Sequence, residues 1–152
     1  MENNRFINFE DRKEILESLS LLTADTKPKF GILTAQLMVE HLAVTVQFSN
    51  GNKPLQNYRE ENRLIEYLMS NQEMPTGAKF FLVGNNLAEP ITNNFAEAVN
   101  YLITELNDFD KYFIENPQHT PTHGVFGNLD KIQWQIAHSK HFTHHFKQFG
   151  IY

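Results

Sequence analysis

The chain contains no cysteine. This excludes disulfides, thiolate metal ligands and a thiol nucleophile carried by the protein, so any thiol chemistry needs a small molecule that brings the sulfur. No apolar run approaches the roughly 20 residues that span a bilayer. Residues 1–11 are polar and acidic and lack the apolar segment of a signal peptide. We therefore expect a cytoplasmic protein without a membrane partner.

Positive charge is also scarce. Lysine and arginine number 13 against 18 acidic residues, which leaves a net charge of −5. No basic track for a nucleic acid is present, and we expect no such partner. Hydrophobic residues make up 41% of the chain and charged residues 20%, with 13 phenylalanines. This composition is typical of a globular protein with an aromatic core, and the length suits a single domain over 1–152.

Five segments have the apolar periodicity of helices. They cover residues 9–22, 35–49, 60–69, 94–114 and 129–149. Asn8, Thr34 and either Asn128 or Asp130 are suitable N-caps, and Gly150 is suited to end the last helix. Residues 80–83 are predicted as one short strand and 116–128 as a loop. Because four of the helices are long and amphipathic, we expect an all-α four-helix bundle with one extra short helix.

Histidines gather near the end of the chain, where four of the seven fall within eight residues. At 100° per residue, one face of the last helix carries core-type residues and three of these histidines. This face consists of Trp134, His138, His141, Phe142, His145 and Phe149. The helical wheel directs Ser139, Lys140, Thr143 and Lys147 away from it, and His144 toward solvent or the edge of the bundle.

The spacing of two of these histidines is suited to a metal ion. His141 and His145 lie one helical turn apart, and His41 is the only other histidine on a strong apolar face. Three imidazoles from two helices would leave coordination positions open, as in catalytic rather than structural zinc sites. Glu40 points about 100° away from His41. The alternative is that these histidines are ordinary core residues with backbone or hydroxyl partners.

Other catalytic motifs are missing. The sequence has no Gly-x-Ser-x-Gly motif, and Ser139 faces away from the histidine face. Gly124 and Gly127 lack the Lys-Ser/Thr ending of a phosphate-binding loop.

The segment His141-Phe-Thr-His144-His145-Phe-Lys-Gln148 resembles the His-x-x-His-His-x-x-Gln signature on the last helix of the DinB-like bundles. The segments 6–12, 33–41 and 123–151 are similar to a small branch of that superfamily, so the resemblance covers essentially the whole chain. It implies a four-helix bundle with a divalent metal on His41, His141 and His145. Phe146 stands where many relatives have arginine, so no substrate role is carried over to it.

The resemblance also implies a class of chemistry, because relatives include transferases and isomerases that use a metal to activate a low-molecular-weight thiol. Our main hypothesis is a metal-dependent enzyme that transfers a small thiol to an electrophile or performs a metal-assisted hydrolysis. Zinc or nickel is the favoured ion, and iron also suits imidazole ligands. Residues expected beside the metal or in the wall of an apolar substrate pocket are His138, His123, Trp134, Phe48 and Phe142.

The alternative hypothesis is a non-catalytic bundle that acts in binding or in a stress response. In either case the exposed apolar edge of such bundles favours a homodimer. Metal content after purification without a His-tag separates the two hypotheses.

Overall fold

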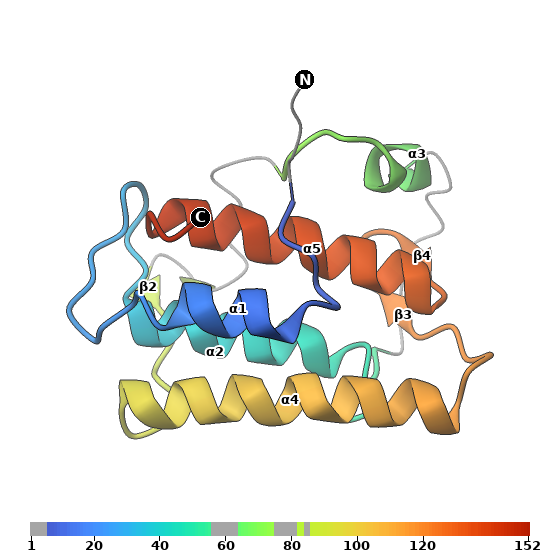
Figure 1. Ribbon diagram of the computed structural model, residues 1–152, viewed down its shortest axis with the longest axis horizontal. Coiled ribbons are helices and arrows are strands. Elements are labelled where there is room, and N and C mark those ends of the chain that lie inside the picture. The colour runs from blue at the N-terminus through green and yellow to red at the C-terminus, as the bar shows by residue number, and fades with distance from the viewer. Residues whose placement is uncertain (1–5, 56–63, 75–81, 84–85) are drawn as a thin grey trace.

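The computed structural model describes residues 6–55, 64–74, 82–83 and 86–152. Within these ranges the chain is mostly helical, as expected for an all-α protein. The helices are α1 (Arg12–Leu19), α2 (Ala35–Gln47), α3 (Leu64–Met69), α4 (Phe95–Glu115) and α5 (Lys131–Gln148). The four longer helices lie side by side along the long axis of the molecule (Figure 1). Among the described helices, none is long and apolar enough to cross a membrane.

Two small antiparallel hairpins accompany the helices. β1 (Leu82–Val83) pairs with β2 (Asn86–Leu87), and β3 (Thr122–His123) pairs with β4 (Gly127–Asn128). The strand expected at 80–83 is thus present at 82–83 and has a partner, while 80–81 lie outside the described residues. The expectation of an irregular loop over 116–128 is wrong in part, because β3 and β4 form within it.

Capping residues set the ends of the helices. The side chain of Thr34 accepts the Leu37 N–H at 3.1 Å, and Asp130 forms a reciprocal capping box with Gln133. Gly150 follows the C-cap residue Phe149 of α5 and has a positive φ of 71°, as expected for a glycine that ends a helix.

The first helix begins later than expected, because its N-cap is Asp11 rather than Asn8. The side chain of Asn8 accepts the N–H of Glu10, and its carbonyl accepts the N–H of Asp11 at 2.9 Å. Asn8 therefore stabilises a turn that precedes the helix. Residues 60–63 of the helix predicted at 60–69 lie outside the described residues. The rest of that prediction, 64–69, is confirmed as α3.

The core is rich in aromatic side chains, and residues before α1 belong to it. Phe9 is fully buried and meets Phe109 and Phe142 edge-on, with ring centroids 5.1 and 5.4 Å apart. Trp134 and Phe146 are buried in the same cluster. Such edge-on pairs stabilise the packing beyond the area that they bury.

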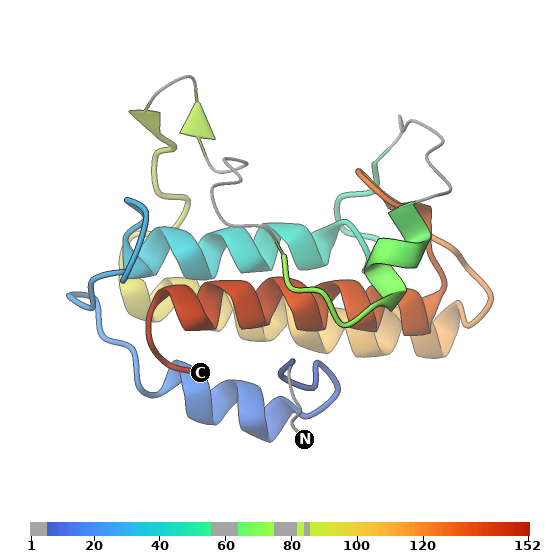
Figure 2. The same ribbon diagram turned by 90° about the horizontal axis from the view of Figure 1, so that it is seen from above.

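Helix α5 is covered on more than one side, since it packs against both α2 and α3 (Figure 2). The sequence predicted that Lys140 and Thr143 point away from the buried face of this helix. Both are nevertheless buried, since each is only 1% exposed. The hydroxyl of Thr143 accepts the Ile7 N–H at 2.8 Å, and the Lys140 ammonium donates to the carbonyls of Tyr67 and Gln72. Polar residues of α5 thus bind the backbone of two segments that cover it.

Candidate metal centre

Three histidines converge between α2 and α5. His41 lies on α2, and His141 and His145 lie one turn apart on α5. Each offers one ring nitrogen, and these three atoms lie within 4.8 Å of one another, so the group could hold a metal ion. His145 is buried, whereas His41 and His141 are partly exposed. The helical wheels therefore selected three side chains that the fold brings together.

Two of the three nitrogen spacings match neighbouring ligands of one ion. The Nε2 atom of His141 lies 3.0 Å from Nε2 of His41 and 3.1 Å from Nε2 of His145. Two nitrogens that are each about 2.1 Å from an ion lie about 3.0 Å apart at a bond angle of 90°, and about 3.4 Å apart at the tetrahedral angle. The two spacings that involve His141 therefore match the distance between neighbouring ligands at an angle near 90°. Three protein ligands leave positions open for other ligands.

The Nδ1 atoms of His141 and His145 each contact a polar side chain on the outer side of the triad. Nδ1 of His145 lies 2.7 Å from Oε1 of Gln148, an acceptor. Nδ1 of His141 lies 3.3 Å from the hydroxyl of Thr45, whose single hydrogen is donated to the Leu42 carbonyl at 2.8 Å. Gln148 therefore makes Nδ1 of His145 the donor in the neutral ring, and the Thr45 hydroxyl can accept from Nδ1 of His141 in the same way. With both protons on Nδ1, both Nε2 atoms direct lone pairs toward the triad.

Burial keeps these rings neutral. Desolvation, with a smaller contribution from His144, lowers the pKa of His41 to about 4. Desolvation and the neighbouring His41 lower the pKa of His145 to about 3. The pKa of His141 also falls well below 6.5, because it is desolvated and is next to both of its partners. Neutral imidazoles are the form that binds a metal, so the three rings are ready as ligands at neutral pH.

Two residues adjacent to the triad histidines in the sequence, His144 and Glu40, have other partners. His144 is half-buried on α5, with its ring 4.8 Å from that of His145 and 5.8 Å from that of Phe30. Glu40 is 2% exposed, and its carboxylate accepts the N–H groups of Ile91 and Thr92 at 2.8 Å. The carboxylate adjacent to His41 thus holds the segment that leads into α4.

His138, Trp134 and Phe142 lie along the same helix but belong to the core. Nε2 of His138 is 2.8 Å from the Ser49 hydroxyl, and its ring stacks on those of Phe9 and Trp134. The indole N–H of Trp134 donates to the Pro121 carbonyl at 2.9 Å. Phe142 is fully buried. His138 still affects the triad electrostatically, because it contributes to the lowered pKa of His141.

His123 lies in β3, where its Nδ1 accepts the N–H groups of Val125 and Phe126 at 3.0 and 3.3 Å. Its ring lies 5.0 Å from that of Trp134. Burial lowers the pKa of His123 to about 4. These contacts place it at the turn of the hairpin and against the core.

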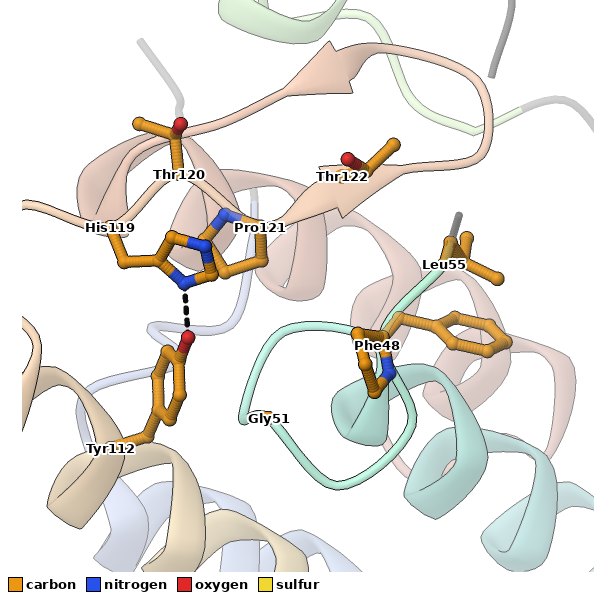
Figure 3. A pocket seen from close by; sticks show the side chains of 9 residues that line it. Phe48, Gly51, Leu55, Tyr112, His119, Thr120, Pro121 and Thr122 are labelled. Carbon is orange, nitrogen blue, oxygen red and sulfur yellow. Dashed lines mark hydrogen bonds between the residues drawn. The ribbon is translucent and has the colours of Figure 1, made fainter. Parts of the chain in front are cut away.

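Phe48 lines a small cavity of about 110 Å³ at the C-terminal end of α2 (Figure 3). The other side of this cavity is formed by the pair of Tyr112 and His119, whose hydroxyl and Nδ1 are hydrogen-bonded. His41, His141 and His145 are not in its lining. The sequence predicted Phe48, Trp134 and Phe142 as walls of one pocket, whereas these contacts divide them between this cavity and the core.

The sequence analysis assigned no role to Gln148 or Thr45. In the structure Gln148 contacts Nδ1 of His145, and Thr45 contacts Nδ1 of His141. Their spacing offers a signal. Gln148 follows His145 by three residues and Thr45 follows His41 by four, so each lies one helical turn from a histidine.

Comparisons of the chain with protein-family models, with curated proteins and with solved structures found no match in any of the three.

Proposed function

We propose that this protein binds a divalent transition metal through the Nε2 atoms of His41, His141 and His145 and is a metal-dependent enzyme. One observation carries the proposal. The Nε2 atoms of His141 and His145 lie 3.1 Å apart, and their Nδ1 atoms face the hydroxyl of Thr45 and Oε1 of Gln148, respectively. With both rings protonated on Nδ1, the two Nε2 lone pairs would repel each other, and a cation bound between them and the third imidazole would relieve that repulsion.

The residues of the triad would hold the ion, and Thr45 and Gln148 would orient His141 and His145 through their Nδ1 atoms. A cation on three neutral ligands keeps its charge and, when bound, lowers the pKa of a thiol or water beside it. We infer that the protein transfers a low-molecular-weight thiol to a small electrophile, with metal-assisted hydrolysis as the variant. The absence of cysteine agrees with an external thiol.

The resemblance to the DinB-like four-helix bundles supports the same assignment, since that superfamily is expected to place a metal on these three positions. Imidazole ligands favour zinc or nickel, and iron is also compatible with them. We further propose that the substrate is a small molecule and that the enzyme is cytoplasmic. It would act as a monomer or a homodimer.

The test begins with untagged protein, whose metal content is measured by elemental analysis. Metal should be present in about one equivalent per chain, and a chelator should lower the melting temperature. A ligand bound only to the native state at 100 times its Kd contributes about 2.7 kcal/mol of stability. Metal-loaded and metal-free samples are then assayed with small thiols and an electrophile such as an aryl halide or an epoxide.

Metal-dependent consumption of both substrates would support the enzyme. If the protein binds metal but catalyses neither thiol conjugation nor hydrolysis, this would support a non-catalytic metal-binding protein. A protein with neither bound metal nor a melting response to added zinc, nickel or iron would contradict the proposal as a whole.

A further inference from the structure

Gln148 connects the candidate metal centre to a distant part of the chain. It is 3% exposed at the last position of α5, where its Oε1 lies 2.7 Å from Nδ1 of His145. Its Nε2 donates to the backbone carbonyl of Phe30 at 3.1 Å, across 118 positions of the sequence. One buried amide thus contacts both a triad histidine and the segment before α2.

The contact with Phe30 determines which way the amide points. A backbone carbonyl can only accept a hydrogen bond, so the amide must present its NH₂ group to Phe30. Its oxygen then faces His145 and can only accept the proton of Nδ1. With the proton held on that side of the ring, Nε2 of His145 carries a lone pair toward the triad.

We propose that Gln148 is a positioning residue, which holds His145 in the tautomer that binds a metal and makes the segment Lys29–Gly31 part of the site's support. The effect on metal binding rests on the proposed function, whereas the tautomer of His145 does not. Without the amide oxygen, the proton of His145 could occupy either nitrogen. In those molecules that carry the proton on Nε2, a metal could bind only after this proton had moved or left.

The segment Lys29–Gly31 fits closely against this end of α5. The Lys29 N–H donates to the backbone carbonyl of Gln148 at 2.7 Å. Gly31 has a φ of +79°, and a Cβ atom there would lie 2.9 Å from Nε2 of Gln148. The Phe30 ring lies beside His144. A side chain at position 31 would therefore push against the amide that orients His145.

Two pairs of variants test the proposal in the full chain. Gln148→Leu removes the amide at similar volume, and Gln135→Leu is the matched control on the same helix, six positions before His141. Gly31→Ala strains the backbone and pushes on the amide, and Gly51→Ala is its control, since Gly51 also has a positive φ (+83°) and a Cβ there would press on the Tyr112 ring instead. Circular dichroism establishes that each variant is folded.

The first readout is the protonation of the His145 ring nitrogens in the metal-free protein, measured by ¹⁵N NMR. We expect the proton on Nδ1 in the wild type and in both controls, and a mixture of tautomers in Gln148→Leu. The variant Gln148→Glu loses the donor to Phe30 but keeps an oxygen that accepts from Nδ1, so the proton should stay on Nδ1. A wild type with the proton on Nε2 would overturn the proposal even if Gln148→Leu failed to fold.

The second readout is the affinity for Zn²⁺, measured by competition with a chelator. Loss of a hydrogen-bond partner to a metal ligand typically weakens binding about 10- to 100-fold, which we expect for Gln148→Leu. Gly31→Ala should weaken binding in the same direction, and both controls should match the wild type. Wild-type affinity in Gln148→Leu, together with an unchanged tautomer, would overturn the positioning role. Failure of the wild type to bind Zn²⁺ would instead count against the proposed function, while the NMR result would still decide the role of Gln148.

Discussion

The Nε2 atoms of His41 and His141 lie 3.0 Å apart, although 100 positions separate the two residues in the sequence. His145 completes the group from the next turn of α5. The group therefore exists only when α2 and α5 are packed together. Any ion that it binds in the folded chain would favour this packing over the unfolded state.

Adjacent histidines on α5 should differ in their effect on metal binding. We expect His145→Ala to lose the metal, because it removes one of the three converging nitrogens. His144→Ala should retain it, since consecutive helical residues diverge by 100° and the His144 ring lies against Phe30. Elemental analysis of the two purified, folded variants is the measurement. An empty His144→Ala protein together with a loaded His145→Ala protein would contradict the assignment of ligands.

The metal-free protein should lose stability as the pH falls from about 6.5 to about 4. Burial lowers the pKa of His123 to about 4 and affects His41 similarly. The unfolded chain therefore binds more protons in this window, and the free energy of unfolding decreases with each protonation. For His123 alone the decrease is at most about 3 kcal/mol. The stability contributed by its neutral form is fully present above about pH 6.5.

Urea unfolding at a series of pH values measures this effect. The variant His123→Asn keeps an acceptor near Val125 and Phe126 but cannot titrate, so its stability should depend less steeply on pH than that of the wild type. Parallel curves for the two proteins would show that His123 does not contribute.

Two lysines of α5 should differ in their contribution to stability. Lys140 is 1% exposed and donates to the carbonyls of Tyr67 and Gln72, whereas the ion pair of Lys147 with Glu73 lies at the surface. Lys140→Met keeps the apolar stem but leaves two carbonyls without their donor, so we expect a loss of about 1–3 kcal/mol. Lys147→Met should cost less than about 1 kcal/mol. Equal losses in chemical unfolding would argue against the buried role of Lys140.

Thr143→Val should also destabilise the fold, although valine has nearly the same shape. The substitution removes the acceptor of the buried Ile7 N–H, and an unsatisfied buried donor costs about 1–3 kcal/mol. Thr120→Val, at an exposed position, is the control and should leave the melting temperature nearly unchanged. Hydrogen exchange at Ile7 gives a local measurement, because its amide should lose protection in Thr143→Val and keep it in the control.

The apolar periodicity of the sequence predicted the helices and the triad. The helical phase places His141 and His145 on the apolar face of α5, and it places His41 on the apolar face of α2. It could not predict how the opposite face of α5 is used. Thr143 and Lys140 are polar residues that resemble a solvated surface in a helical wheel, yet they bind backbone groups of segments far away in the chain. Such pairings depend on the topology rather than on local pattern.

The surroundings of the triad were harder to predict for the same reason. Trp134 lies on the expected helix and Phe48 directly follows α2, but their contacts depend on where Pro121 and the β3–β4 hairpin pass. Gln148 acts through the carbonyl of Phe30, a backbone atom that carries no signal in the sequence.

The hydrogen bond between Ile7 and Thr143 joins residues 136 positions apart, and it determines when the protein can finish folding during its synthesis. Ribosomes add about 5–20 residues per second, so Thr143 is synthesised about 7–27 s after Ile7. Throughout that interval the apolar side chains of Ile7 and Phe9, both 0% exposed in the finished fold, lack the helix that covers them. His41 likewise waits for both of its partners, so a nascent chain cannot assemble the three-nitrogen group until α5 has left the ribosome.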